Sequence, residues 1–191
     1  MGSSLSSERP IVSGVLQGTV LGPLLFLLYI NDISAAVKHS QSFIYADDLK
    51  CVYSFKNSTS LHCLEQIHAD LLALSAWSSK WLMEFSPSKC RNMCFGPDRL
   101  PQPVVFQGTP MTECTTIKDL GLSYTSNLDL SPHADRITAK AAQICGFISC
   151  NFCLAEITLR LYRMSELPLL EYCCPFFGLM NDASRLKIEN V

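Results

Sequence analysis

Apolar and polar positions along the chain follow two periods, and together they predict a fold with both helices and strands. Residues 20–37 are apolar on nearly every side, so we expect one helix there that is buried on most of its faces. Residues 42–55 alternate with a period of two, which predicts a β-hairpin with Asp47 and Asp48 at or beside its tip. A helix is expected to begin at Ser60, because apolar residues then recur at three- and four-residue steps or their multiples. This stripe consists of Leu61, Leu64, Ile67, Leu71, Leu74 and Trp81.

Proline and serine residues mark the ends of elements in the rest of the chain. A Ser-Pro-Ser triplet at 86–88 ends the amphipathic helix, and residues 89–95 then predict a strand. Four prolines follow closely and predict a connection that holds a short strand at 104–106. The next helix is expected to begin at Ser131, a good cap followed by proline, and a last helix covers residues 155–167. The stripe of the helix that begins at Ser131 consists of Ile137, Ala141, Ile144 and Ile148.

The composition is that of a globular protein, but the charge adds a constraint. The 191 residues are 48% hydrophobic and 17% charged, so a core of ordinary size can be buried. The net charge is −2, and Lys and Arg are spread thinly without a basic cluster. A protein that holds a nucleic acid backbone usually carries a basic stripe. Either nucleic acid is therefore not the ligand, or the basic surface lies in a part of the protein outside this sequence.

Ten cysteines raise the question of disulfides or zinc. Most lie in apolar runs, where a free cysteine behaves as a small buried hydrophobe. The only Cys-x-x-Cys pair is Cys150 to Cys153, and no second pair has the spacing of a zinc finger. We therefore expect buried, reduced cysteines and an intracellular location, in the cytoplasm or the nucleus. A secreted cysteine-rich protein is the alternative, and several native disulfides would favour it.

The most hydrophobic run, residues 20–30, predicts a core helix and no membrane partner. It is shorter than the ~20 apolar residues that cross a bilayer. Pro23 interrupts the run, which also argues against a signal peptide.

Asp47 and Asp48 are the strongest candidates for a functional site in this sequence. Two neighbouring carboxylates repel each other in a tight turn, and a hard cation such as Mg²⁺ between their oxygens relieves that repulsion. Taken alone, the pair is more typical of an ordinary polar turn, in which Asp is common. The surrounding sequence reverses this interpretation.

The two aspartates end the segment Tyr45-Ala46-Asp47-Asp48, and further recognisable segments stand on both sides. They are SGVLQGTVLGPLLF at 13–26, IND at 30–32, tryptophans 77 and 81 with FSPSKC at 85–90, LGL at 120–122 and PLLEY at 168–172. In order and approximate spacing, these segments resemble the boxes of reverse transcriptases of the non-LTR (LINE-like) retrotransposon kind. The resemblance covers nearly the whole chain beyond residue 11. A Tyr-x-Asp-Asp segment alone is a weak signal, whereas six segments in order are a strong one.

The resemblance implies an α+β fold with the second half of a catalytic palm and a thumb-like region. Residues 1–12 are expected to be a disordered N-terminus, and residues 13–96 would form a partial palm subdomain. That subdomain would contain a buried helix, the YADD hairpin, the amphipathic helix and a strand. Residues 97–130 would form a Pro-rich connection with short strands, and residues 131–191 a helical thumb-like region.

The resemblance also implies roles for individual residues. Asp47 would be the principal ligand of Mg²⁺ or Mn²⁺ and Asp48 would assist, in a two-metal nucleotidyl transfer. Lys89 would lie near the incoming triphosphate as a proton donor to pyrophosphate, or would be a solvated turn lysine. The partners would be an RNA template, a DNA primer and a dNTP. The residues expected to line the nucleotide and template site are Gly14, Gln17, Gly18, Tyr45 and Ala46.

Departures from the family pattern change the expected activity. Leu16 stands where the family usually has proline, and the loss of the proline frees the loop. Thr19 stands where the family has serine. The family's first palm motif brings another Asp on a separate strand, and none of the thirteen residues before Gly14 is Asp. We therefore expect a fragment of an RNA-directed DNA polymerase that is inactive alone and self-associates through an exposed sheet edge. A polymerase piece completed in trans and a non-catalytic binding or structural protein are the alternatives.

Overall fold

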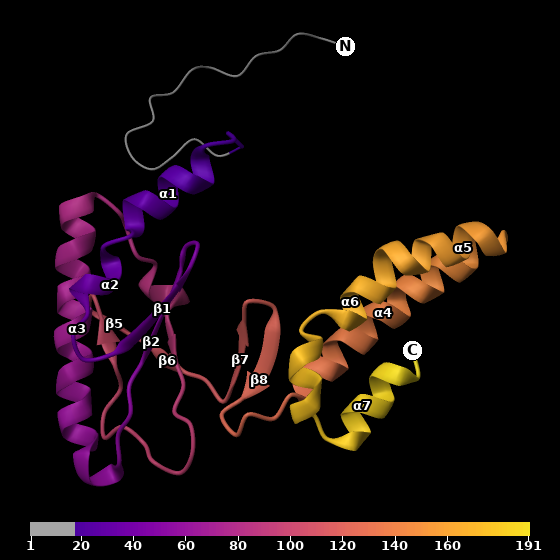
Figure 1. Ribbon diagram of the computed structural model, residues 1–191. Coiled ribbons are helices and arrows are strands. Elements are labelled where there is room, and N and C mark those ends of the chain that lie inside the picture. The colour runs from indigo at the N-terminus through magenta and orange to yellow at the C-terminus, as the bar shows by residue number, and fades with distance from the viewer. Residues whose placement is uncertain (1–17) are drawn as a thin grey trace. The chain divides into compact units, whose positions relative to one another are not determined.

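Helices and short antiparallel hairpins form an α+β fold in the computed structural model, which describes residues 18–191 (Figure 1). The chain divides into two units, one made of residues 1–92 and 98–112 and the other of residues 93–97 and 113–191. The expected disordered N-terminus and two expected site residues, Gly14 and Gln17, lie outside the described residues. No helix within the described part of the chain has both the length and the apolar character needed to cross a bilayer.

The first unit is built around one long helix. Its elements are α1 (Gly22–Ile30), α2 (Ile33–Ala36), β1 (Gln41–Tyr45), β2 (Asp48–Val52), a 3₁₀ turn (Asn57–Thr59), α3 (Ser60–Trp81), a 3₁₀ turn (Pro87–Lys89), β3 (Arg91–Asn92), β4 (Val105–Phe106) and β5 (Thr109–Pro110). β1 pairs with β2 and β4 pairs with β5, both antiparallel. The short β6 (Thr112–Glu113) follows in the sequence at the boundary between the units.

α3 confirms the predicted amphipathic helix and contributes to two apolar clusters. Leu74 and Trp77 pack in the first cluster, together with Ile30, Ile33 and Val37. Residues nearer the start of α3 form the second cluster, which consists of Cys63, Leu64, Ile67 and Val104.

Two details of this helix differ from the prediction. Leu61 is 60% exposed because it lies in the first turn, ahead of the second cluster. The helix ends at Trp81, earlier than the predicted break, because Leu82 adopts a left-handed φ of 53° and the Met83 amide donates to the Ser78 carbonyl at 3.1 Å.

The single buried helix predicted over residues 20–37 is wrong in two respects. A turn at Asn31 and Asp32 divides it into α1 and α2, and the Trp77 indole Nε1 donates to Asp32 Oδ1 at 2.8 Å. Most of α1 is also exposed, because its packing against the first cluster centres on Ile30. The exposed fractions are 62% for Leu21, 56% for Leu24, 50% for Leu25, 50% for Leu27 and 66% for Leu28.

The strand predicted over residues 89–95 is also wrong for most of its length. Pro87 begins a 3₁₀ turn that extends to Lys89, which leaves only the two residues of β3 in extended pairing.

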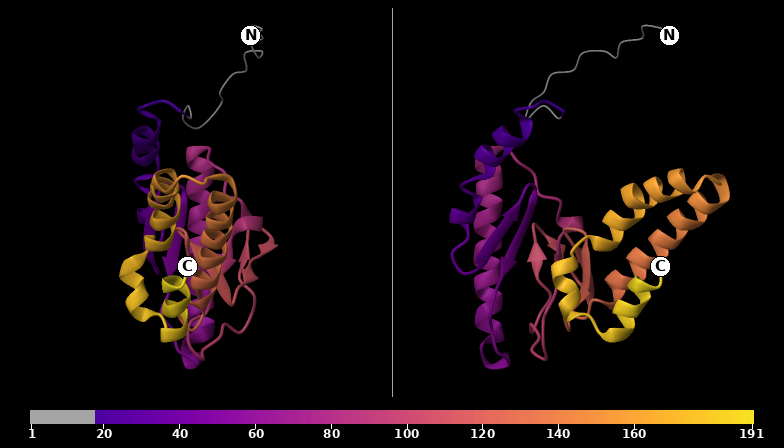
Figure 2. Two further views of the ribbon diagram at one scale, coloured as in Figure 1. Left: turned by 90° about the vertical axis from the view of Figure 1, so that its right-hand side faces the viewer. Right: turned by 45° about the vertical axis from the view of Figure 1, so that its right-hand side comes forward.

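The second unit combines one hairpin with a set of helices. Its elements are β7 (Thr116–Asp119), β8 (Leu122–Thr125), α4 (Ser131–Asn151), α5 (Ala155–Leu161), a π-helical turn (Tyr162–Glu166), α6 (Leu167–Glu171), a 3₁₀ segment (Cys174–Leu179) and α7 (Asp182–Glu189). α5, the π-helical turn and α6 form one rod that runs beside α4 (Figure 2). The last predicted helix is therefore present but extends four residues beyond residue 167. The predicted stripe of α4 is confirmed, since Ile137, Ala141 and Ile148 are buried.

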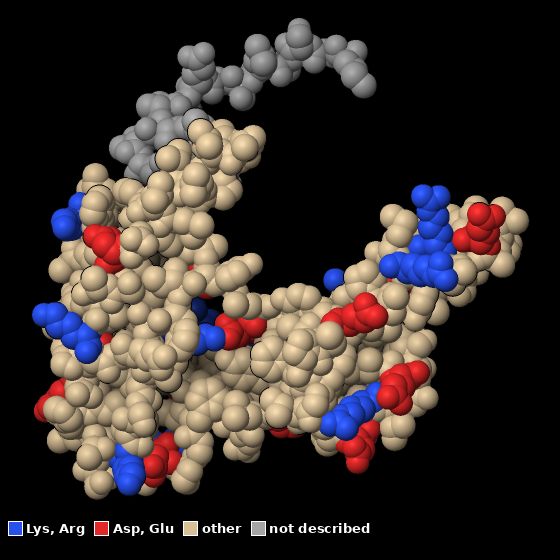
Figure 3. All heavy atoms as spheres, in the orientation of Figure 1, with Lys and Arg blue, Asp and Glu red and all other residues tan. Residues whose placement is uncertain are grey.

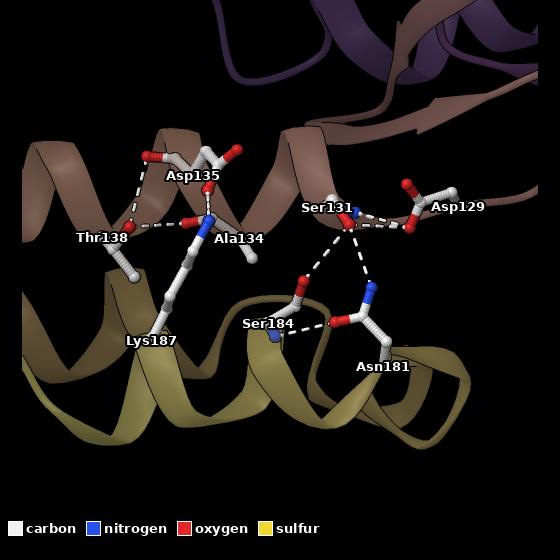
Figure 4. Close-up of polar contacts among 8 residues, drawn as sticks. All are labelled: Asp129, Ser131, Ala134, Asp135, Thr138, Asn181, Ser184 and Lys187. Atoms are coloured by element: carbon white, nitrogen blue, oxygen red, sulfur yellow. Dashed lines mark hydrogen bonds and ion pairs between the residues drawn. The ribbon is translucent and has the colours of Figure 1, made fainter.

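Polar contacts fasten α7 to the start of α4 (Figure 4). Asn181 caps α7 by accepting from the Ser184 amide at 2.8 Å, and it donates to the Ser131 hydroxyl at 3.2 Å. Lys187 forms an ion pair of 2.5 Å with Asp135. Ser131 is the first residue of α4 rather than its cap, and Asp129 accepts from the Ser131 amide at 3.1 Å.

No disulfide joins any of the ten cysteines, all of which lie within residues 18–191, and only Cys63 and Cys94 are buried. Cys150, Cys153 and Cys174 are exposed. The prediction of general burial fails because the apolar runs that hold these residues lie partly on the surface.

Candidate functional site

The β1–β2 hairpin places Asp47 and Asp48 at its tip. Tyr45 pairs with Asp48 across the strands, so Ala46 and Asp47 form a two-residue turn. Ala46 has a φ of 50°, whereas the φ of Asp47 is not positive. This combination is the pattern of a type II′ turn. That turn favours glycine at its first central position, and an L-residue there costs about 1–2 kcal/mol. The strained residue therefore lies directly before the candidate metal ligands, a location where backbone strain is often functional.

Both aspartates are exposed, and their carboxylates make no hydrogen bond or ion pair with any residue that the structure describes. Uncommitted carboxylate oxygens are suitable ligands for a hard divalent cation. Within residues 18–191, however, no three His, Cys, Asp or Glu side chains come together as a metal site. The pair therefore fits part of a Mg²⁺ or Mn²⁺ site, and two carboxylates alone bind such an ion weakly.

The hairpin is held by its inward face. Ile44, Leu49 and Cys51 pack against the cluster that contains Ile33 and Trp77. The opposite face is open, with Phe43 50% exposed and Tyr45 66% exposed. One face of the hairpin thus anchors it to α2 and α3, and the other presents aromatic side chains beside the aspartates.

Asp70 on α3 closes the base of the hairpin, and sequence reasoning missed it. Its buried carboxylate accepts from the Lys38 amide at 2.9 Å, from the His39 amide at 3.2 Å and from the Tyr53 hydroxyl at 3.0 Å. Lys38 and His39 precede β1 and Tyr53 follows β2, so one side chain ties together the chain segments on both sides of the hairpin. A signal was present, because Asp70 follows Ile67 by three residues and so falls on the buried side of α3.

The pKa of Asp70 reflects two opposing effects. Burial acts to raise the pKa of this carboxyl, but the hydrogen bonds from the Lys38 amide, the Tyr53 hydroxyl and the His39 amide outweigh it, so the net pKa lies below its ordinary value. Burial likewise raises the pKa of the Tyr53 hydroxyl, which keeps it a neutral donor to Asp70.

The structure brings together only some of the predicted site residues. Tyr45 and Ala46 adjoin the aspartates in the hairpin. Gly18 has a φ of 85° with open space where a side chain would stand, but no described contact joins it to the hairpin tip. Lys89 is exposed at the end of its 3₁₀ turn, and no described hydrogen bond or ion pair links it to Asp47 or Asp48.

A groove of the first unit lies elsewhere, beside α1. It has a volume of about 470 Å³ and does not include Asp47 or Asp48. Residues 18–31 contain no charged side chain, and the surface of α1 that faces the viewer in Figure 3 is uncharged. The residues that line this groove are Leu25, Leu28, Tyr29, Asn31, Asp32 and Trp81.

Comparisons with known proteins point in one direction. The family model described as reverse transcriptase (RNA-dependent DNA polymerase) matches residues 1–140. The probable RNA-directed DNA polymerase from transposon X-element of Drosophila melanogaster is 29% identical over 199 residues, which cover 99% of this chain and 22% of that protein. The corresponding protein from transposon BS is 28% identical, with 74% of this chain and 16% of that protein covered. The RNA-directed DNA polymerase from mobile element jockey is 26% identical, with 96% and 21% covered. The chain thus spans 22% or less of the length of these relatives, and no solved structure matches it.

Proposed function

The chain belongs to the reverse transcriptase (RNA-dependent DNA polymerase) family, and from this we propose that it is the part of an RNA-directed DNA polymerase that carries the metal-binding hairpin. The observation that carries the proposal is the pair Asp47 and Asp48 at the tip of an anchored hairpin, exposed and with carboxylates that have no partner among residues 18–191. The similarity to transposon polymerases supports a retrotransposon origin of the LINE-like kind.

The residues at the tip of the hairpin each have a role in this proposal. Asp47 holds the divalent cation, Mg²⁺ or Mn²⁺, and Asp48 assists from the adjacent position. A bound ion there would lower the pKa of the primer hydroxyl and neutralise charge on the triphosphate. Tyr45 and Ala46 face the primer end and the nucleotide, and Lys89 donates a proton to pyrophosphate from its exposed turn. Asp70 is a positioning residue, since it acts through the hairpin rather than on the substrate.

The proposed substrates are a dNTP and a DNA primer on an RNA template. The proposal assigns the floor beneath the templating base to Gly18, where glycine lets the backbone approach closely, and to Gly14 and Gln17, which lie outside the described residues. We assign residues 13–96 to a partial palm, residues 97–130 to a connection and residues 131–191 to a thumb-like region. The two-cluster packing of α3 beneath the hairpin and the helical character of the second unit support these assignments.

We expect the chain to be inactive by itself, because among residues 18–191 no third carboxylate comes together with Asp47 and Asp48. A third carboxylate from another segment would complete the two-metal site. The test is primer extension on an RNA template with Mg²⁺ or Mn²⁺, together with a Mn²⁺ titration that is followed by paramagnetic broadening. We expect no extension and only millimolar-range binding, as is typical of a sparse oxygen site.

The matched control is Asp129→Asn, an exposed aspartate outside the hairpin. Asp47→Asn should remove the weak broadening of the hairpin signals, whereas Asp129→Asn should leave it unchanged. Extension above background that Asp47→Asn abolishes would contradict the expected inactivity. Broadening that both variants leave intact would contradict the assignment of the site.

A non-catalytic binding or structural protein on the same scaffold is the second candidate. The lack of a three-ligand metal group in the described residues favours it. Binding of an RNA–DNA hybrid that is unchanged by Asp47→Asn and by chelation of divalent metal would support this candidate over the catalytic one.

A further inference from the structure

The β7–β8 hairpin and the chain that follows α6 meet at one tight turn. Leu120 and Gly121 link the two strands, and their φ values of 46° and 89° are both positive, as in a type I′ turn. The Leu120-Gly121 and Leu170-Glu171-Tyr172 segments both stood out in the sequence, and neither has a role in the proposed chemistry.

Tyr172 covers this turn with its ring and its hydroxyl. The hydroxyl donates to the Leu120 carbonyl at 2.5 Å. A Cβ atom added to Gly121 would stand 2.8 Å from Cε1 of Tyr172 and 3.2 Å from its Cζ. No residue with a side chain fits there unless the ring moves.

The second carbonyl of the turn, that of Gly121, also accepts a side-chain hydrogen bond. Arg136 on α4 donates from Nη2 to the Gly121 carbonyl at 2.6 Å, and the same nitrogen lies 3.1 Å from Nδ1 of His133. His133 is completely buried, and Arg136 is partly buried. Side chains from α4 and from the end of α6 therefore hold both carbonyls of a two-residue turn.

We propose that Tyr172 and Arg136 form a clamp that fixes the β7–β8 turn as a rigid element and presents Leu120, which is 44% exposed, at its tip. The clamp couples three elements that are distant in the sequence, since the Tyr172 and Leu120 contact spans 52 residues. It explains why a glycine at the turn and a tyrosine after α6 belong together in one chain. This inference goes beyond the proposed function, because it requires neither metal nor nucleic acid.

The structure provides a matched control for the glycine. Gly108 lies in the β4–β5 turn with a φ of 77°, and nothing stands within 4 Å of a Cβ atom added to it. Gly108→Ala therefore measures the backbone cost of a positive φ alone, whereas Gly121→Ala adds the collision with Tyr172.

Thermal unfolding of the full chain tests the clamp. We expect Gly121→Ala to lower the Tm clearly more than Gly108→Ala does. In a Tyr172→Ala background, the additional effect of Gly121→Ala should shrink to that of Gly108→Ala, because the collision is gone. Equal effects of the two glycine variants, with no rescue by Tyr172→Ala, would overturn the proposal.

Hydrogen exchange measured by mass spectrometry separates local positioning from overall stability. Tyr172→Phe keeps the ring but removes the donor to Leu120, so exchange over residues 119–122 should accelerate by roughly five- to tenfold. Exchange over the buried stripe of α4 should change less than about twofold in the same variant. Uniform acceleration across both segments, or none in the turn, would show that Tyr172 does not act as a clamp.

Discussion

Glu166 is a residue whose position is physically unfavourable. It is 1% exposed in the π-helical turn, where it lines a groove of about 430 Å³ with Ile148 and Tyr162, and no hydrogen bond or ion pair joins its carboxyl to another residue of 18–191. Burial of a polar group without a partner costs about 1–3 kcal/mol. Glu166→Met keeps a similar volume without the polar atoms.

We therefore expect Glu166→Met to raise the free energy of unfolding by about 1–3 kcal/mol, measured by urea denaturation at pH 7. The control is Glu171→Met, because Glu171 is an exposed residue of α6. Its free energy of unfolding should stay within about 0.5 kcal/mol of the parent. A lower stability for Glu166→Met would show that the carboxyl has a favourable interaction in solution.

His133 makes stability depend on pH in a defined window. Burial lowers the pKa of the His133 imidazole below its ordinary value of 6.5, and the neighbouring Arg136 charge lowers it further, against the opposing backbone contact with Tyr172. The unfolded chain therefore binds a proton near pH 6.5, while the folded chain stays neutral until a lower pH. Stability is full above pH 6.5 and falls as the pH decreases through the lower, folded-state pKa.

We expect the stability of the parent chain to fall with decreasing pH below 6.5, by at most about 1.4 kcal/mol per pH unit from this residue. His133→Gln should flatten that slope, even if it lowers stability at every pH. Denaturation midpoints between pH 5 and 7.5 provide the measurement.

At the scale of elements, α1 exposes several large apolar side chains. Its exposed leucines form an uncharged face beside the groove that Leu25 and Leu28 line. An apolar patch of this kind marks an interaction surface or a site of aggregation. The open edges of the β1–β2 hairpin offer a second route to self-association, because unpaired strand edges bind other chains.

We expect Leu24→Gln combined with Leu28→Gln to reduce oligomer mass in light scattering and to reduce fluorescence of a hydrophobic dye. Leu72→Gln is the control, because Leu72 is a 72% exposed leucine that belongs to α3 rather than to α1. If the double variant changes neither readout whereas Phe43→Lys on the hairpin does, the hairpin rather than α1 drives association.

Sequence periodicity located some of these elements well and others poorly. The period of two found the hairpin, and the stripe found α3, because each pattern has one covered face. The uniform run over residues 20–37 had no such contrast, so the polar turn at Asn31 and Asp32 was hidden inside it. The π-helical turn was not foreseen either, since its sequence YRMSE carries no signal that separates it from an α-helix.

At the scale of the whole molecule, long-range contacts are what the sequence could not provide. Asp47 and Asp48 are neighbours in the sequence, so a local motif was enough to identify them. Asp70 and the clamp of Tyr172 and Arg136 depend on partners 15 to 52 residues away, and no spacing rule specifies such pairs. The thin spread of Lys and Arg was evident from the sequence, and Figure 3 shows scattered charges of both signs on the visible face.

The π-helical turn determines how this helix would respond to the deletion of a single residue. A π turn is what a helix forms when it absorbs one extra residue without breaking. Each residue of an α-helix rotates the chain by about 100°, so deleting one residue from Tyr162–Glu166 would turn everything after it by that angle. The rod would become a regular helix, but Tyr172 would swing off the Leu120 carbonyl and Glu166 would leave its buried position. The number of residues in this helix therefore determines both the contact of Tyr172 with Leu120 and the burial of Glu166.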